Sequence, residues 1–395
     1  MKYALIIPDG AADEPIASIG DKTPLQVAET PNMDWIAQNG RVGTVKNVPQ
    51  GLPCGSDVAI LSLLGYDPKE HYTGRAPLEA AAQGIDVGAD EWVFRCNLVT
   101  IVDGLMEDHS AGHITTKEAT AIIEEFNEKL AAPGLKFYPG VSYRHLMTYE
   151  GELNITTTPP HDILGKNASG YLPGGQGAEK LRTLIQLSQE ILENHDINVV
   201  RRDLGENPAT SMWLWGEGKM PNLPRFEKLF GIKGAAITAV DLIRGISKLI
   251  DWNVIEVQGA TGNLDTNYEG KGAAAVKALD DHDIVCVHVE APDECGHAGD
   301  VSGKVKAITE IDKHVVGPVV DRLKKEGDDW RILVLPDHPT PIEFRTHTAG
   351  AVPFALAGKR IEAVVHGPFC EATGEISDLH IPRGCELMEF FLTVR

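Results

Sequence analysis

The chain has few of the features that mark secreted, membrane-spanning or disulfide-stabilised proteins. Its six cysteines are scattered through 395 residues and are nowhere spaced as Cys-x-x-Cys, so neither a disulfide framework nor a zinc–thiolate site is expected. No run approaches the roughly 20 apolar residues of a membrane helix. The apolar start at residues 3–7 is too short for a signal peptide. We therefore expect a cytoplasmic protein that has no membrane partner.

Positive charge is also scarce. There are 36 Lys and Arg residues against 57 Asp and Glu residues, which gives a formal net charge of −21. This balance disfavours a nucleic-acid partner, because a phosphate backbone requires a basic surface. A phosphate-ester substrate would need a local cationic pocket or a bound metal to reverse the field. The oligomeric state cannot be deduced from the sequence.

Apolar, β-branched runs recur at widely separated places, at residues 3–7, 252–257, 284–289 and 331–335. Continuous apolar runs are typical of parallel strands that are covered on both faces. Helical patterns lie between them. A capping box at Thr115 and Glu118 opens a helix that runs to about Leu130, and amphipathic patterns follow at residues 178–194 and 304–325. The alternation predicts an α/β fold with a doubly wound, mostly parallel sheet.

The length of the chain predicts two domains. Most of the turn-rich sequence lies between residues 80 and 236, including the Pro- and Gly-rich stretches at 159–160, 173–175 and 221–224. We expect residues 1–79 and 237–395 to form the core and residues 80–236 to form a second α/β domain inserted into it.

Three of the apolar runs lead into residues of the types that bind metals. The first leads to Asp9, the third to Asp293 and His297, and the fourth to Asp337 and His338, with His347 shortly after. Ligands of open α/β sheets bind at the carboxyl ends of the strands, so these side chains should converge. Each residue alone has an ordinary structural explanation, such as an Asp-Gly turn. Their coincidence at three strand ends predicts a metal site for Mn²⁺, Mg²⁺ or Zn²⁺.

Ser56 directly precedes a short apolar helix that Gly65 ends. A structural role as helix N-cap would explain it, and a helix N-terminus is also an anion site suited to a phosphoryl group. A serine hydroxyl needs a base or a metal to become a nucleophile. No Gly-x-Ser-x-Gly motif surrounds Ser56, so we expect a metal to activate it. Cys54 is the rival nucleophile.

Together these segments resemble the alkaline-phosphatase superfamily. More closely, they resemble the cofactor-independent (2,3-bisphosphoglycerate-independent) phosphoglycerate mutases of the archaeal type. The resemblance covers nearly the whole chain and rests on residues 7–10, 55–57, 291–297 and 335–338 with His347. It extends to residues 24–34, 63–68, 72–75, 110–114 and 140–145.

The resemblance implies an alkaline-phosphatase-like fold, two divalent metal ions and a phosphoserine intermediate. Manganese would be the foremost metal, with Mg²⁺, Co²⁺ and Zn²⁺ as alternatives. One ion would be held by Asp9, Ser56, Asp337 and His338, and the other by Asp293, His297 and His347. Ser56 would take the phosphoryl group of 3-phosphoglycerate and return it to the 2-hydroxyl of the retained glycerate.

The resemblance also assigns the inserted domain the role of a lid that binds a small phosphorylated acid. Its basic residues Arg144 and Lys166 would grip the substrate, with Lys271 and Arg75 on the core side and His109 and Asp162 as polar orienting groups.

Other functions remain open at this stage. Residues 265–271 and 143–146 resemble a bacterial branch proposed to phosphorylate homoserine, and a phosphatase or phosphopentomutase could use the same scaffold. A catalytically inactive binding protein is a further alternative. All seven expected nucleophile and metal positions are filled, which argues against that last reading.

Overall fold

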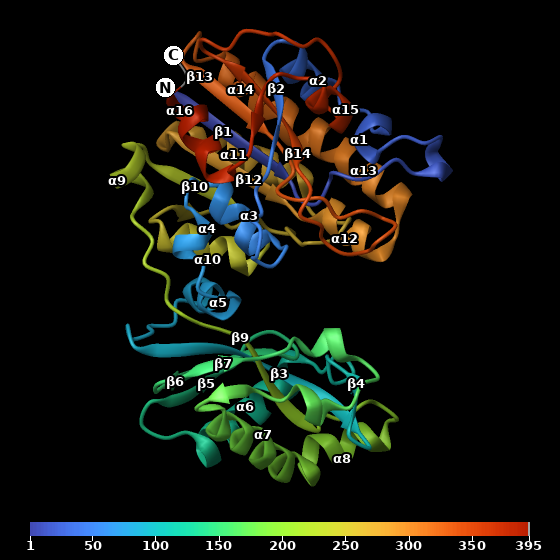
Figure 1. The fold of residues 1–395 in the computed structure, drawn as a ribbon, viewed down its shortest axis with the longest axis vertical. Coiled ribbons are helices and arrows are strands. Elements are labelled where there is room, and N and C mark those ends of the chain that lie inside the picture. Colours follow the sequence, from blue (N-terminus) through green and yellow to red (C-terminus); the bar gives the residue numbers. More distant parts are fainter. Residues whose placement is uncertain (394–395) are drawn as a thin grey trace. The chain divides into compact units, whose positions relative to one another are not determined.

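The computed structural model describes residues 1–393, which form two compact units (Figure 1). The core unit comprises Met1–Tyr72 and the chain from Asn222 onward, and the inserted unit comprises Thr73–Pro221. Both boundaries differ from those expected from the sequence. The expected boundary at residues 236–237 falls inside strand β10 (Gly234–Ile237). Arg75, which we expected on the core side, belongs to the inserted unit.

The core unit is built on an eight-stranded, mostly parallel sheet, in which Figure 1 shows blue segments beside orange and red ones from the other end of the chain. Strand β1 lies between β12 and β13 and is parallel to both, whereas β14 is antiparallel to its neighbours β13 and β2. The strand order is β11 (Asn253–Val254), β10, β12 (Ile284–Val289), β1 (Lys2–Pro8), β13 (Trp330–Val334), β14 (Val352–Gly358), β2 (Arg41–Val45) and β15 (His380–Ile381). The predicted mostly parallel sheet, with residues 3–7 and 284–289 in the same sheet, is confirmed.

Helices cover both faces of this sheet, which explains why its central strands are apolar throughout. Alternate residues such as Ala4 and Ile6 pack with α2 (Pro31–Gln38), α11 (Tyr268–Asp281), α13 (Val301–Ile311) and α14 (Gly317–Lys324). On the other face the Tyr3 ring meets Phe391 of α16 (Leu387–Thr393), with ring centroids 5.5 Å apart. Helix α10 (Asp241–Leu249) contacts β10 and α3 (Ser56–Leu63).

The helix expected at residues 304–325 is interrupted. A wider π-helical turn, Asp312–Val316, joins α13 to α14, and Pro318 follows in the first turn of α14. Proline has no N–H to continue the regular ladder of hydrogen bonds, which accounts for the irregularity there. The core unit also contains α1 (Pro24–Val27), α4 (Pro68–His71), α9 (Phe226–Phe230), α12 (Ala291–Ala298) and α15 (Glu371–Glu375).

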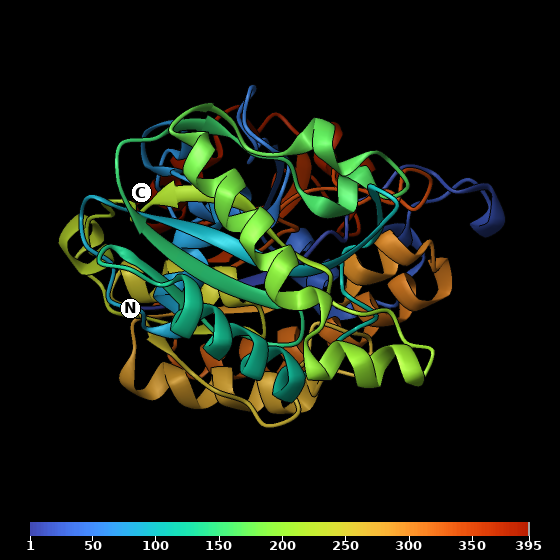
Figure 2. The same cartoon turned by 90° about the horizontal axis from the view of Figure 1, so that it is seen from below.

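The inserted unit has an antiparallel sheet of its own, in the order β4 (Leu105–Asp108), β3 (Glu91–Val102), β6 (Arg144–Glu150) and β5 (Leu135–Tyr138). Strand β9 (Ser211–Lys219) pairs with the other side of β3. Figure 2 shows α6 (Thr116–Leu130) and α7 (Ala178–Glu193) lying across one face, where they enclose a separate apolar core. The predicted capping box of α6 is present. The unit also includes α5 (Arg75–Gln83), α8 (Asp196–Asp203) and the β7–β8 pair (Asn154–Thr156 and Gly174–Gln176).

Within residues 1–393, we find no helix whose length and apolar character would let it cross a bilayer.

Candidate functional site

Carboxylates and imidazoles from three strand ends lie together at the carboxyl edge of the core sheet. Asp9 follows β1, Asp337 and His338 follow β13, and α12 begins directly after β12. Three overlapping groups of donor atoms each lie within 4.8 Å of one another: Asp293, His297 and His347; Asp9, Asp293 and His338; and Asp9, His288 and Asp337. All six Asp and His residues that we proposed as ligands from the sequence occur in these groups.

The first set of donors surrounds the ring of His338. Its Nε2 atom lies 3.3 Å from Asp337 Oδ2 and 3.6 Å from Asp9 Oδ1. Both of these oxygens are buried and have no hydrogen-bond partner among the described residues. The Ser56 hydroxyl lies 3.2 Å from the same nitrogen and 3.5 Å from Asp9 Oδ2. A cation among these atoms would satisfy oxygens that the protein itself leaves unpaired.

The crowding of carboxylates affects the acidity of Asp9. Burial, followed by the nearby Asp337 carboxylate, raises the pKa of Asp9 well above its ordinary value. Burial lowers the pKa of His338, so that its ring is neutral at physiological pH and its charge cannot offset the carboxylates. Full ionisation of both buried carboxylates therefore requires a compensating positive charge, which a divalent cation would supply.

The second set comprises Asp293, His297 and His347. The two Nε2 atoms lie 2.9 Å apart and are 3.3 and 3.4 Å from the Asp293 carboxylate oxygens. His297 Nδ1 faces the Arg345 carbonyl at 3.0 Å, and His347 Nδ1 faces the Cys54 carbonyl at 3.1 Å. A carbonyl only accepts, so each Nδ1 carries the hydrogen and each neutral ring presents a bare Nε2 lone pair.

Two bare lone pairs and a carboxylate would repel one another unless a cation lay between them. A proton on one of the rings is the alternative to such a cation. Burial opposes ionisation of Asp293, but its hydrogen bonds with His297 and His347 lower its pKa well below the usual range. The hydrogen bond to Asp293 raises the pKa of His297 to about 9. Backbone carbonyls behind metal-binding imidazoles are a common supporting arrangement, and this set of donors fits a divalent ion.

Helix α3 presents Ser56 to the first set of donors. The N-cap is Gly55, in an extended conformation, and Ser56 is the first helical residue. The N-cap position that we considered for Ser56 from the sequence is therefore occupied by Gly55. The hydroxyl instead faces Asp9 and His338. Burial raises the pKa of the rival Cys54, which keeps its thiol protonated and weakly nucleophilic.

Two residues at this site were not identified from the sequence. His288 Nε2 lies 2.8 Å from Asp9 Oδ2, and its ring is buried within β12. Thr340 donates its hydroxyl hydrogen to Asp293 Oδ1 and lies 3.3 Å from His338 Nδ1. The sequence could have identified His288, because it is a histidine in an otherwise apolar strand. Thr340 carried no signal, because a threonine in a loop is ordinary.

The six proposed substrate-binding residues divide between the two units. Lys271 lies in α11 of the core unit, where it is fully buried. Its Nζ lies 3.5 Å from the His288 carbonyl, and burial lowers its pKa to about 8. The other five belong to the inserted unit: Arg75, His109, Arg144, Asp162 and Lys166.

A cationic and aromatic cluster in the inserted unit includes several of these residues. The buried Arg95 guanidinium stacks on Trp215 at 4.3 Å and forms an ion pair with Glu79 at 3.0 Å. Burial lowers the pKa of Arg95 to about 10, and the positive charges of Arg75 and Arg144 act in the same direction. Three guanidinium groups near a single carboxylate would be stabilised by an anion.

The histidines continue this cluster. His161 meets Trp215 with ring centroids 5.4 Å apart, and His109 meets both His161 and Tyr143. Asp162 Oδ1 lies 3.7 Å from His161 Nε2 of this cluster, and Lys166 lies one turn further along the chain. Both are exposed, and Lys166 Nζ donates to the Asp162 carbonyl at 3.0 Å. Arg95, His161 and Trp215 were not identified from the sequence.

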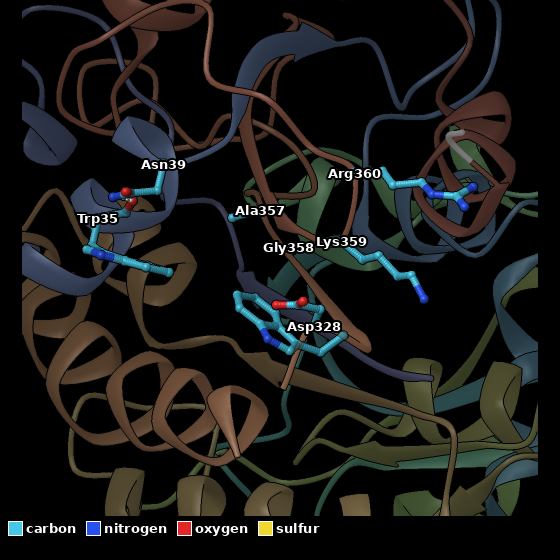
Figure 3. Close-up of a pocket in the computed structure, with 8 residues that line it drawn as sticks. Trp35, Asn39, Asp328, Ala357, Gly358, Lys359 and Arg360 are labelled. Carbon is cyan, nitrogen blue, oxygen red and sulfur yellow. Dashed lines mark hydrogen bonds between the residues drawn. The ribbon is translucent and has the colours of Figure 1, made fainter. Parts of the chain in front are cut away.

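A separate cavity of about 490 Å³ lies elsewhere on the core unit (Figure 3). Figure 3 shows Trp35 of α2 and Asn39, which follows this helix, on one side of it, and Lys359 and Arg360 beyond the end of β14 on the other. It is also lined by Trp330, which opens β13 and pairs with Lys2 at the start of β1. This cavity therefore lies at the amino edge of the parallel strands, away from the metal donors.

Comparisons with known proteins agree on one family. A family model described as 2,3-bisphosphoglycerate-independent phosphoglycerate mutase matches residues 37–198. A relative of that name from Methanothrix thermoacetophila is 51% identical over 361 residues, which cover 91% of this chain and 92% of the relative. A Geobacter sulfurreducens protein, named as a probable enzyme of the same kind, is 47% identical over 99% of this chain and 100% of its own length.

Solved structures show the same fold over the full length. A Pyrococcus horikoshii protein is 30% identical with a TM-score of 0.84, covering 99% of this chain and 96% of its own. A cofactor-independent phosphoglycerate mutase from Thermoplasma acidophilum is 27% identical with a TM-score of 0.66, covering 99% of both chains.

An α/β sheet that gathers carboxylates and imidazoles at its carboxyl edge, beside a serine at a helix N-terminus, is an arrangement suited to metal-assisted phosphoryl transfer. Its relatives are about half identical to it over nearly its whole length. The chain belongs to the family of 2,3-bisphosphoglycerate-independent phosphoglycerate mutases.

Proposed function

We propose that this protein interconverts 3-phosphoglycerate and 2-phosphoglycerate through a phosphoserine at Ser56, without 2,3-bisphosphoglycerate. The observation that carries the proposal is the position of the Ser56 hydroxyl, 3.2 Å from His338 Nε2 and beside two buried carboxylates whose free oxygens suit a metal ion. The names of its relatives give the same reaction.

The two donor sets assign seven residues to two divalent ions. Asp9, Ser56, Asp337 and His338 would hold one, and Asp293, His297 and His347 the other. When bound, these ions supply Lewis acidity, lowering the pKa of the serine hydroxyl and neutralising charge on the phosphoryl oxygens. Manganese is our choice among them, because mixed carboxylate and imidazole donors without thiolate suit it well.

The chemical step exchanges one phosphorus–oxygen bond for another. Ser56 Oγ loses its proton and attacks phosphorus, and Asp9 Oδ2, 3.5 Å away, is the carboxylate oxygen to which that hydroxyl donates. The bond from phosphorus to the 3-oxygen of the substrate breaks as the bond to Oγ forms, and that oxygen takes up a proton. In the second half the 2-hydroxyl of glycerate attacks the phosphoserine, which restores the Ser56 hydroxyl. No net oxidation or hydrolysis occurs.

The glycerate must stay bound between the two halves, and water must be kept away from the phosphoserine. We assign the role of lid to the inserted unit, because its three guanidinium groups, those of the buried Arg95, the half-buried Arg75 and the exposed Arg144, are suited to a carboxylate or phosphate. Lys271 would serve from the core unit, since its pKa near 8 lets it carry a positive charge at neutral pH. Lys166 and Asp162 stay proposed substrate contacts from the same unit, with side chains that are exposed like that of Arg144.

The deciding experiment compares two reaction mixtures by phosphorus NMR. Metal-stripped protein is reloaded with Mn²⁺ and given either 3-phosphoglycerate alone or ATP with homoserine. We expect 2-phosphoglycerate to form in the first mixture, and we expect this activity to disappear with EDTA and return with Mn²⁺. Reaction in the second mixture alone would replace the mutase with a homoserine kinase. Full activity after metal removal, with metal content measured as zero, would overturn the metal assignment.

A further inference from the structure

We propose that the single hydroxyl of Thr340 orients a metal donor in each of the two sites, as a positioning residue shared by both. This inference rests on the two-metal site proposed above and adds a residue that is not itself a ligand. Thr340 lies two residues after His338 and is fully buried.

The direction of each hydrogen bond follows from the chemistry of the partners. Thr340 Oγ1 contacts Asp293 Oδ1 on one side and His338 Nδ1, at 3.3 Å, on the other. The hydroxyl donates to Asp293 Oδ1, because a carboxylate oxygen accepts hydrogen bonds. The threonine hydrogen therefore points to Asp293, and a lone pair of Oγ1 is left facing the His338 ring.

This arrangement fixes the tautomer of His338. Because Oγ1 has given its one hydrogen to Asp293, the contact with the ring is favourable only if Nδ1 carries the imidazole hydrogen. Nε2 is then bare and faces Asp337 Oδ2 at 3.3 Å and Asp9 Oδ1 at 3.6 Å. A bare nitrogen beside these two carboxylate oxygens, with the Ser56 hydroxyl 3.2 Å away, is suited to a cation that all four groups could bind.

The same hydroxyl also orients Asp293, which belongs to the second set of donors. Asp293 Oδ1 accepts from Thr340 and lies 3.4 Å from His347 Nε2, while Asp293 Oδ2 lies 3.3 Å from His297 Nε2. One O–H group thus sets the rotation of a carboxylate in the second site and the tautomer of an imidazole in the first. The Pro339 carbonyl also accepts from the His338 ring, and it is the competing explanation for that tautomer.

The loop that carries Thr340 is held in place from behind. Its backbone carbonyl accepts from the buried Lys304 ammonium at 2.8 Å, and a Cβ atom at Gly10 would lie only 2.6 Å from its hydroxyl oxygen. There is no room for the hydroxyl to be replaced by a larger group or to swing away. Substitutions at this position must therefore be isosteric or smaller.

The test is calorimetric titration of metal-stripped protein with Mn²⁺, with binding fitted to two sites. Thr340→Val removes the hydroxyl at nearly constant volume, and we expect both binding steps to weaken about 10- to 100-fold, as is usual when a group supporting metal ligands is lost. Thr340→Ser keeps the hydroxyl and should bind within about threefold of wild type, on the same scale. Thr100→Val removes another buried threonine hydroxyl, which donates to Pro208 in the inserted unit, and should leave both steps unchanged.

Each outcome of the titration distinguishes between explanations of the role of Thr340. Wild-type affinity in Thr340→Val would show that the Pro339 carbonyl alone sets the tautomer, and weakening of only one step would confine Thr340 to one site; either overturns the proposal. Equal loss in Thr340→Ser would assign the effect to the methyl group and overturn it as well. Thr340→Ala provides a second hydroxyl-free variant if the valine protein does not fold. Failure of the wild type to bind Mn²⁺ would instead refute the two-metal site itself.

Discussion

Ser56 is the residue whose side chain combines two roles, since its oxygen is both the proposed nucleophile and one of several ligands. Ser56→Ala should therefore abolish turnover, by at least about a thousandfold on the usual scale for a lost nucleophile, while most Mn²⁺ binding persists. The measurement is mutase rate beside metal titration. Ser62→Ala, in the same helix and with a hydroxyl that has no partner among the described residues, is the matched control and should stay active. More than about a tenth of wild-type rate in Ser56→Ala would rule out a phosphoserine.

His288 forms a hydrogen bond with the proposed ligand Asp9, as backbone carbonyls do with the proposed ligands His297 and His347. Its Nδ1 faces the Thr238 hydroxyl at 3.3 Å, and its Nε2 donates to Asp9 Oδ2 at 2.8 Å, which leaves Asp9 Oδ1 free. Burial lowers the pKa of His288 to about 3, so the ring stays neutral. We expect His288→Ala to weaken one Mn²⁺ step about 10-fold or more.

His288→Gln separates two roles for this ring, because the glutamine amide can reach the position of Nε2 and donate to Asp9. Substantial recovery of Mn²⁺ affinity in this variant would support a positioning role. Equal loss in the Gln and Ala variants would make His288 a metal ligand, and wild-type affinity in both would leave it no role at the site.

At the scale of single residues, the sequence predicted the proposed metal ligands better than the residues that position those ligands. Asp9, Asp293 and Asp337 follow apolar runs directly, so strand topology alone brings them to one edge. Thr340 and His288 act through contacts with residues 47 and 279 positions away, respectively, and no local pattern encodes such pairs. The substrate-binding roles of Lys166 and Asp162 stay predictions, and their charge alone did not indicate that both side chains are exposed.

At the scale of elements, the loops after β1 and β13 are tied together by α13. The Lys304 ammonium is fully buried and contacts Asp13 Oδ2 at 2.7 Å, the Thr340 carbonyl at 2.8 Å and the Ala12 carbonyl at 3.4 Å. Glu371, opening α15, joins the network by accepting from the Asp13 N–H at 3.1 Å. The ammonium thus braces two of the loops that carry metal donors.

Lys304→Met should destabilise the core unit by about 3–5 kcal/mol, because the buried Asp13 carboxylate loses its counter-ion and keeps only the Glu14 and Ile342 N–H groups as donors. The double variant Lys304→Met with Asp13→Asn should lose less than the sum of the single changes. Urea denaturation is the measurement, and Lys306→Met on the exposed side of the same helix is the control. A cost below about 1 kcal/mol for Lys304→Met, the range of an exposed ion pair, would contradict the bracing role.

The elements themselves were predicted where the pattern was long or apolar. Strand β12 matches the expected residues 284–289, and α6 begins at its predicted capping box. The run at 252–257 gives only the two-residue β11, because the strand lies at the edge of the sheet. Strands β2, β10 and β14 were not expected. Their small residues, such as Gly43, Gly234 and Ala355, lower local strand propensity, and the sheet itself stabilises them.

At the scale of the whole molecule, the two units have separate apolar cores, so acid can destabilise one without the other. His145 makes the inserted unit sensitive. It is buried in β6, its Nδ1 accepts from the Gly140 N–H at 2.9 Å, and burial lowers its pKa to about 3. The ring is therefore neutral in the folded unit, whereas the unfolded chain binds a proton near the ordinary histidine pKa of about 6.5.

The sign of the pH effect follows from that difference. Between about pH 6.5 and 3 the unfolded chain holds the extra proton, so the contribution of His145 is complete above this range and is lost as the pH falls through it. From pH 7 to pH 5 the loss should reach about 2 kcal/mol.

His145→Asn keeps an acceptor for Gly140 but cannot titrate, so its inserted unit should lose about that much less stability over the same interval. Hydrogen–deuterium exchange of β6 peptides, corrected for intrinsic rates, measures the local free energy of opening in both proteins. Other acid-sensitive groups are common to both, so the difference isolates His145. Equal acid sensitivity of the two proteins would mean that this ring is protonated in the fold, and that its environment is more polar than its burial indicates.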